Sequence, residues 1–162
     1  MRFRNLAFAA GLGMLIAAPA FAQVPVLPSP DQAVLLANAD PQLASNKRLV
    51  YDFWREVLEG GHLELADKYL AEGYIQHNPN VPSGRAGFVE FFGKFAQAKP
   101  IQPTIAGPLV AITAEGHLVT LSFVRQLPDP KDATKTYTTT WFDMFRIEDG
   151  KIAEHWDCAD KQ

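Results

Sequence analysis

The fold is decided by the stretch TYTTTWFDMFRIEDGKIAEHWDC, residues 136–158. Two runs rich in β-branched and aromatic residues flank the pair Asp149-Gly150, a strong signal for a tight hairpin turn. We therefore expect one strand over Thr136–Glu148 and a second, antiparallel strand over Lys151–Cys158. The hairpin is the best-defined supersecondary unit that the sequence predicts.

Two further strands are expected on the N-terminal side of this hairpin, where the apolar pattern has a period of two after Pro100. They cover Thr104–Thr113 and His117–Leu127. The turn residues 114–116 separate them from each other, and Asp129-Pro130 separates the second from the hairpin. The C-terminal half is thus predicted to be a run of strands joined by short turns.

Helical periodicity dominates the residues that precede the strands. Asp40-Pro41 gives an N-cap followed by proline at the first helical position, and the helix is expected to continue to Glu59 before Gly60-Gly61. Shorter helices are expected over Leu63–Leu70 and Arg85–Ala98, with a short extended piece at residues 74–78 between them. Helices first and strands after them predict an α+β domain in which three N-terminal helices pack on a strongly curved, mostly antiparallel sheet. Such a sheet can enclose a cone-shaped pocket for a small ligand.

The N-terminus has the layout of a secretory signal peptide. Arg2 and Arg4 precede the apolar run 6–18, and Ala20-Phe21-Ala22 places small residues before a cut at Gln23. We expect residues 1–22 to be a cleaved signal peptide, 23–40 a proline-rich linker with a possible short helix, and 41–162 the folded domain. The protein is then periplasmic or secreted, with no membrane association after cleavage.

Composition and motifs exclude several functional classes. The formal net charge is −3, and no basic cluster or basic helix face favours nucleic acid. There is no Gly-x-Ser-x-Gly elbow, no phosphate loop and no dinucleotide fingerprint in a strand-to-helix context. Cofactor-free acid–base chemistry and simple ligand binding remain.

Asp143 is the sharpest local anomaly in the sequence. Strand alternation places it on one face with Trp141 and Phe145. A carboxylate between aromatic rings is costly unless it is paired, protonated or facing a cavity. The alternative is that Phe142 and Met144 mark the buried face, and periodicity leaves both faces open because both are apolar.

Histidines offer a second set of candidates. His77, in the extended piece before Pro79, could accept a proton or donate to a carbonyl, although a structural role is the common one for a histidine. His155 and Asp157 share one face of the last strand, opposite to Trp156, and could hold a metal. Two ligands at this spacing are weak evidence, and no His-Glu-x-x-His or Cys/His cluster is present. We therefore expect neither a metal nor an organic cofactor.

Three segments resemble the SnoaL-like polyketide cyclases of the nuclear-transport-factor-2-like superfamily. They are residues 74–79 (YIQHNP), 142–146 (FDMFR) and 149–157 (DGKIAEHWD), and the similarity runs in order from about Leu43 to Asp157. The resemblance implies a cone-shaped pocket without metal or cofactor, in which Asp143 acts as general acid/base. It also implies that His77 and Asn78 are polar residues of the pocket and that His155 and Trp156 belong to the closing motif. Trp141 and Phe123 complete the expected contacts with the substrate.

The expected function is that of a cofactor-free acid–base enzyme, of the aldol cyclase, isomerase or lyase type, acting on a small apolar carbonyl compound in the cell envelope. Asp143 would be the base and His77 the donor to the carbonyl. The alternative is a non-catalytic small-molecule-binding protein of the periplasm, because polyketide cyclases work in the cytoplasm whereas this chain carries an export signal. A homodimer formed through the outer face of the sheet is compatible with either function.

Overall fold

The computed structural model describes residues 23–162, so the predicted signal peptide lies outside the described residues. Its centre is a five-stranded sheet in the order β1-β5-β4-β3-β2. The strands are β1 (Leu70–Gln76), β2 (Leu109–Glu115), β3 (Leu118–Asp129), β4 (Asp132–Glu148) and β5 (Lys151–Asp157). All neighbours pair antiparallel except β1 and β5, which are parallel. The predicted α+β class with a mostly antiparallel sheet is confirmed, and the sheet is open rather than closed into a barrel.

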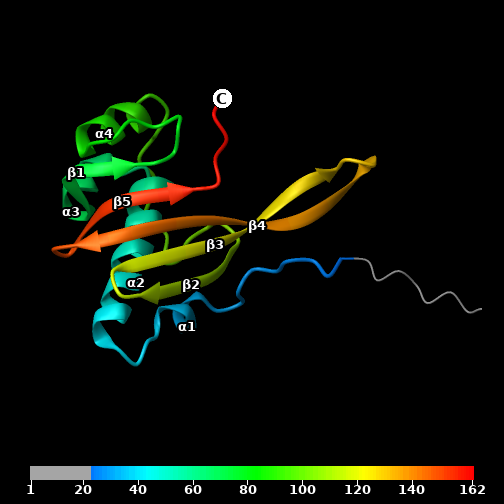
Figure 1. Ribbon diagram of the computed structural model, residues 1–162, viewed down its shortest axis with the longest axis horizontal. Helices are drawn as coiled ribbons and strands as arrows, with labels where there is room; N and C mark the ends of the chain where they lie inside the picture. The colour runs from blue at the N-terminus through cyan, green and yellow to red at the C-terminus, as the bar shows by residue number, and fades with distance from the viewer. Residues whose placement is uncertain (1–22) are drawn as a thin grey trace, which may run out of the picture.

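The longest helix lies against one face of the sheet, two shorter helices lie at its β1 edge, and a fourth lies beside β2 (Figure 1). They are α1 (Gln32–Leu36), α2 (Pro41–Phe53), α3 (Ala66–Tyr69) and α4 (Arg85–Gly93), with a 3-10 turn η2 (Leu63–Leu65) before α3. The expected cap is present, because the Asp40 carboxylate accepts from the backbone N–H groups of Gln42 and Leu43, with Pro41 at the start of the helix. The helix continues beyond α2 as a π-helical turn, η1 (Trp54–Glu59). Wide turns of this kind are frequently found at functional sites.

Several element boundaries differ from the sequence predictions, and three of the differences have a clear local reason or consequence. The second helix is shorter than expected because Leu70 already belongs to β1, where it pairs with Ile152. The third helix ends at Gly93 rather than at Ala98. The strand expected from Thr104 begins only at Leu109, since Pro103 and Pro108 have no N–H to donate to a ladder.

The longest feature of the sheet is the hairpin of β3 and β4, which extends past the other elements as an arm (Figure 1). Its paired residues run from Leu118–Arg146 to Asp129–Asp132, farther than the sequence predicted. The β-branched run Thr138–Thr140 suits this extended pairing. Residues of the N-terminal segment contact the base of the arm, because the Val26 N–H donates to Thr138 Oγ1 at 2.8 Å.

The core between helices and sheet is aromatic. Phe53 of α2 lies 5.9 Å from Tyr69, 5.8 Å from Phe88 and 6.1 Å from Phe145, measured between ring centroids. All four rings are almost completely buried. Among residues 23–162, no helix has the length and apolarity needed to cross a membrane. The helices are thus anchored by a ring cluster that borders the cavity described next.

Candidate active site

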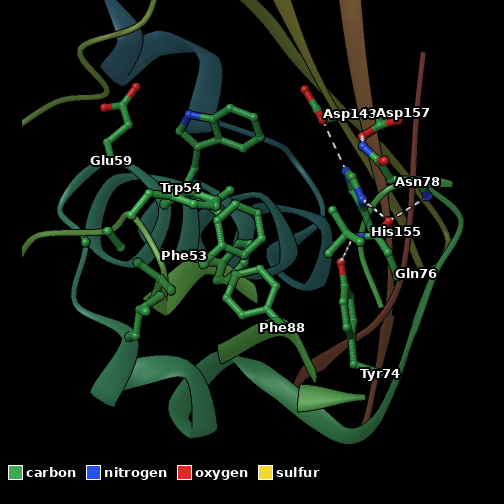
Figure 2. Close-up of a pocket in the computed structure, with 18 of the residues that line it drawn as sticks. Phe53, Trp54, Glu59, Tyr74, Gln76, Asn78, Phe88, Asp143, His155 and Asp157 are labelled. Atoms are coloured by element: carbon green, nitrogen blue, oxygen red, sulfur yellow. Dashed lines mark hydrogen bonds and ion pairs between the residues drawn. The ribbon is translucent and has the colours of Figure 1, made fainter. Parts of the chain in front are cut away.

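A cavity of about 500 Å³ opens between η1, α4 and the inner face of β4 and β5. This volume falls in the range of small-molecule pockets. Its apolar wall is made by Phe53, Trp54, Val57, Leu58, Phe88, Phe92 and Phe145. Its polar wall gathers Tyr74, Gln76, Asn78, Asp143, His155 and Asp157 on one side, as Figure 2 shows. The cavity is therefore apolar on one side and carries a compact polar cluster on the other.

Asp143 lies on the buried face of β4, as one of the two sequence interpretations held. It is 4% exposed, whereas its neighbour Phe142 is 47% exposed on the opposite face. Its Oδ1 lies 3.1 Å from Nε2 of His155, which is itself buried. Its other oxygen, Oδ2, is buried and has no hydrogen-bond partner among the described residues. A buried carboxylate oxygen without a partner calls for a functional explanation.

The hydrogen bonds around Gln76 fix the state of the His155 ring. The Asn78 N–H donates to Gln76 Oε1 at 2.9 Å, while Gln76 Nε2 donates to the Tyr74 hydroxyl at 3.0 Å. Gln76 Oε1 is thus an acceptor that faces His155 Nδ1 at 2.8 Å, so Nδ1 must carry a proton. His155 Nε2 and Asp143 Oδ1 lie 3.1 Å apart. Two acceptors at this distance would repel each other, so one proton must lie between them. Asp143 and His155 therefore form a pair that shares one proton.

Asp157 stands beside this pair, directly opposite Asp143 across the β4–β5 ladder. Its Oδ2 accepts from Asn78 Nδ2 at 2.6 Å and its Oδ1 from the Ala159 N–H at 2.9 Å. Both of its oxygens are thus held by donors. Asn78, expected to be a polar residue of the pocket, lines the cavity and positions this second carboxylate.

His77 does not face Asp143, contrary to the sequence expectation. Its Nε2 lies 2.7 Å from Glu154, and its ring stacks on Trp156 at 5.0 Å and 6°. The side chain is 44% exposed, and neither His77 nor Trp156 lines the cavity. The reason is strand alternation: Tyr74, Gln76 and Asn78 share the inward side of their segment, and His77 has the other parity. The imidazole that meets Asp143 is that of His155.

Phe123 and Trp141, which were expected to contact the substrate, line a second, more open cavity of about 350 Å³. Trp54, Glu59 and Asp143 border both cavities. Trp54 stacks on Phe123 with ring centroids 4.6 Å apart, and the Arg125 guanidinium lies 4.8 Å from the centre of the Trp141 ring. Asp143 thus lies where the two cavities meet.

Three residues of the site, Tyr74, Gln76 and Glu59, were not among the candidates predicted from the sequence. Period-two spacing from Tyr74 to Asn78 was a signal for the first two, because it places them on the same side as the predicted pocket residue. Glu59 gave no such signal. Its carboxylate accepts from the backbone N–H groups of Ala106 and Gly107 at 2.6 and 2.9 Å, contacts between segments far apart in the chain.

Tyr74 is held in its neutral form at the floor of the polar wall. Burial raises the pKa of its phenol well above the ordinary value, and the negative charges of Asp157 and Asp143 raise it further. The hydroxyl accepts from Gln76, so its own proton remains available to a ligand in the cavity. A neutral phenol beside an acid–base pair is a suitable donor to a developing oxyanion.

The raised pKa of Tyr74 predicts a loss of stability at alkaline pH. The folded protein holds this proton more tightly than the unfolded chain, whose tyrosines ionise near pH 10. The contribution to stability is therefore complete below about pH 10 and is lost as the pH rises toward the folded-state pKa. Urea unfolding at pH 8 and pH 11 should show a smaller alkaline loss for Tyr74→Phe than for the wild type. Tyr137→Phe, on the arm, should lose as much as the wild type, and an unchanged loss in Tyr74→Phe would contradict the prediction.

Comparison with known proteins identifies the family. Residues 50–155 match the family model described as the SnoaL-like domain, so the chain belongs to the SnoaL-like family. The resemblance seen in the sequence is therefore confirmed. No curated protein matches the sequence significantly.

The chain is also similar to solved structures, the first of which shows the same fold. A predicted polyketide cyclase from Acidithiobacillus ferrooxidans is 22% identical, with 70% of this chain and 86% of that chain covered and a TM-score of 0.51. An epoxide hydrolase of the LEH-like type from Mycobacterium tuberculosis is 15% identical, with 72% and 84% covered and a TM-score of 0.49. A protein of unknown function with a cystatin-like fold from Xanthomonas campestris is 18% identical, with 70% and 91% covered and a TM-score of 0.48.

Proposed function

We propose that the protein is a cofactor-free acid–base enzyme acting on a small apolar carbonyl compound. The observation that carries the proposal is the Asp143–His155 pair on the polar wall of the cavity, in which Oδ2 of Asp143 has no hydrogen-bond partner among the described residues. A general base needs an unoccupied lone pair, and Oδ2 of Asp143 has one. Membership of the SnoaL-like family supports the same reaction class.

The chemistry assigned to the site is the removal and return of a proton next to a carbonyl group. Oδ2 of Asp143 takes the proton, and the electrons of the C–H bond move into the carbonyl to give an enolate. The proton shared by Asp143 and His155 stays in the hydrogen bond between them during this transfer. The hydroxyl of Tyr74 donates to the enolate oxygen, and the ring cluster holds the apolar body of the substrate. Return of the proton to the same carbon, or to another, gives exchange or isomerisation.

The proposed proton transfer can be tested without knowledge of the natural substrate. The purified protein is incubated in D₂O with 2-tetralone and 1-indanone, two apolar bicyclic ketones with exchangeable protons, and the α-protons are followed by NMR. We expect the protein to accelerate their replacement by deuterium above the buffer rate. Ligand binding without any acceleration, measured for example by quenching of Trp54 and Trp141 fluorescence, would favour the non-catalytic binding protein instead.

Location and assembly also belong to the proposal. The predicted signal peptide, residues 1–22, supports a periplasmic or secreted protein. The outer sheet face carries Phe142, which is exposed, beside the partly exposed Met144 and Trp156. This apolar row supports a homodimer through that face, and sedimentation at micromolar concentration would test it.

A further inference from the structure

The polar wall of the cavity contains a set of groups that matches the needs of a transition-metal ion. Asp143, His155 and Asp157 each offer one ligand atom, and these atoms lie within 4.8 Å of one another. They come from the paired strands β4 and β5, with Asp143 directly opposite Asp157. One imidazole nitrogen and two carboxylate oxygens are therefore held close to one another by two neighbouring strands.

A second observation points to a ligand at this place. Oδ2 of Asp143 is buried and has no partner among residues 23–162, although the side chain lies on the wall of the cavity. Leaving a buried charged oxygen without a donor costs free energy. A bound cation would remove that cost, because carboxylates ligate metals through one or both oxygens.

Two of the three groups, His155 and Asp157, have outer hydrogen-bond partners of the kind found at metal sites. Gln76 Oε1 accepts a hydrogen bond from Nδ1–H of His155, and Nε2 is the nitrogen that faces Asp143. Asn78 and the Ala159 N–H hold the Asp157 carboxylate. Metal-binding histidines and carboxylates are oriented by such outer hydrogen bonds, which fix the ring tautomer and the direction of the lone pairs.

We propose that Asp143, His155 and Asp157 bind one divalent transition-metal cation of the Zn²⁺ type. The 3.1 Å between His155 Nε2 and Asp143 Oδ1 is close to the edge of a tetrahedron with metal bonds of 2.0–2.1 Å, which is about 3.3 Å. Three protein ligands leave a position open to the cavity. The imidazole favours Zn²⁺ over Mg²⁺ and Ca²⁺, which prefer sites made of oxygen alone. This proposal departs from the sequence expectation that no metal binds.

The metal site uses the residues of the proposed function but does not depend on it. A cation held by Nε2 and Oδ1 occupies the space between the two members of the acid–base pair. The same cluster therefore cannot hold the metal and work as that pair at the same time. Metal binding is measured without any substrate, so failure of one proposal leaves the other standing.

The test is a titration of tag-free, chelator-treated protein with Co²⁺, whose visible absorption reports its coordination, followed by displacement with Zn²⁺. We expect one cation per chain, intense tetrahedral-type absorption bands, and no displacement by millimolar Mg²⁺. Asp157→Asn and His155→Gln should each weaken binding by more than the roughly 10–100-fold that is typical of changing an outer partner. His77→Gln is the matched control, since it removes an imidazole that also faces a carboxylate, at 2.7 Å, but outside the cluster.

The result that would overturn the proposal is absence of stoichiometric binding, or equal binding by the wild type and Asp157→Asn. Loss of binding in His77→Gln would also overturn it, because it would place the cation at Glu154 on the outer face. Circular dichroism of each variant shows whether it is folded. Asp157 is only partly buried, so Asp157→Asn remains an informative variant even where His155→Gln does not fold.

Discussion

Replacing Asp143 by asparagine is expected to lower the rate of ketone proton exchange by about 10²–10⁴-fold, the contribution typical of a positioned general base. The amide has the size of the carboxylate but cannot accept a proton at Oδ2, the oxygen that has no partner among the described residues. The measurement is NMR detection of deuterium uptake by 2-tetralone in D₂O. Binding of the ketone, followed by tryptophan fluorescence, should change much less than the exchange rate.

Two histidine variants sharpen this experiment. His155→Gln removes the imidazole that contacts Asp143 at 3.1 Å and should also slow exchange strongly. His77→Gln removes an imidazole that stacks on Trp156 outside the cavity, so exchange should proceed at the wild-type rate. The reverse order, with His77→Gln slow and His155→Gln fast, would contradict the assignment of the pair. Full activity of Asp143→Asn would remove the proposed base.

The largest effect on stability is expected for Phe145→Ala. Phe145 is 1% exposed and contacts both Phe53 and the ring of His155. Truncation of a buried phenylalanine costs about 3–5 kcal/mol, because transfer energy is lost and a hole remains. For a domain of this size the melting temperature should fall by roughly 10 °C or more. Thermal unfolding followed by circular dichroism measures this change.

The matched control lies three residues away in the same strand. Phe142→Ala makes the same chemical change on the opposite face, at a side chain that is 47% exposed. Its free energy of unfolding should stay within about 0.5 kcal/mol of the wild type. Equal losses in the two variants would contradict the assignment of faces in β4, and with it the placement of Asp143 in the cavity.

The sequence was sufficient for those features that depend on local rules. Asp149-Gly150 gave the hairpin of β4 and β5, since few residues other than glycine suit the positive φ of 70° at Gly150. Asp40-Pro41 gave the start of α2 through its capping hydrogen bonds. The order of helices before strands gave the α+β class, and the closing motif gave the family.

Local sequence rules could not predict whether Asp143 lies on the buried face of β4. Both faces are apolar, with Trp141 and Phe145 on one and Phe142 and Met144 on the other. Packing of α2 on the sheet decided it. Phe145 packs against Phe53 in the ring cluster, and Asp143, two residues earlier in the strand, therefore lies on the same buried face. Which face is buried depends on what packs against the strand, a property of distant residues.

The partner of Asp143 was decided by one residue of register. At the turn, Glu148 pairs with Lys151 and Ile147 with Ile152, a register that would bring Trp156 opposite Asp143. The register shifts by one residue next to these pairs, because β5 has one extra residue, Ala153, opposite the Arg146–Ile147 step of β4. Asp157 therefore stands opposite Asp143 and His155 opposite Phe145. A shift of one residue moves every side chain of a strand to the other face.

The sequence by itself therefore determined the elements, their class and the family, because caps, turns and periodicity act over a few residues. Only the tertiary structure decided which imidazole meets the carboxylate. The alternation of side chains along its segment turns His77 outward, whereas the register shift in β5 turns His155 inward. The pairing of β4 with β5 then brings His155 next to Asp143. Pairing between strands is a relation between chain segments, and its offset is set by the packing of both faces.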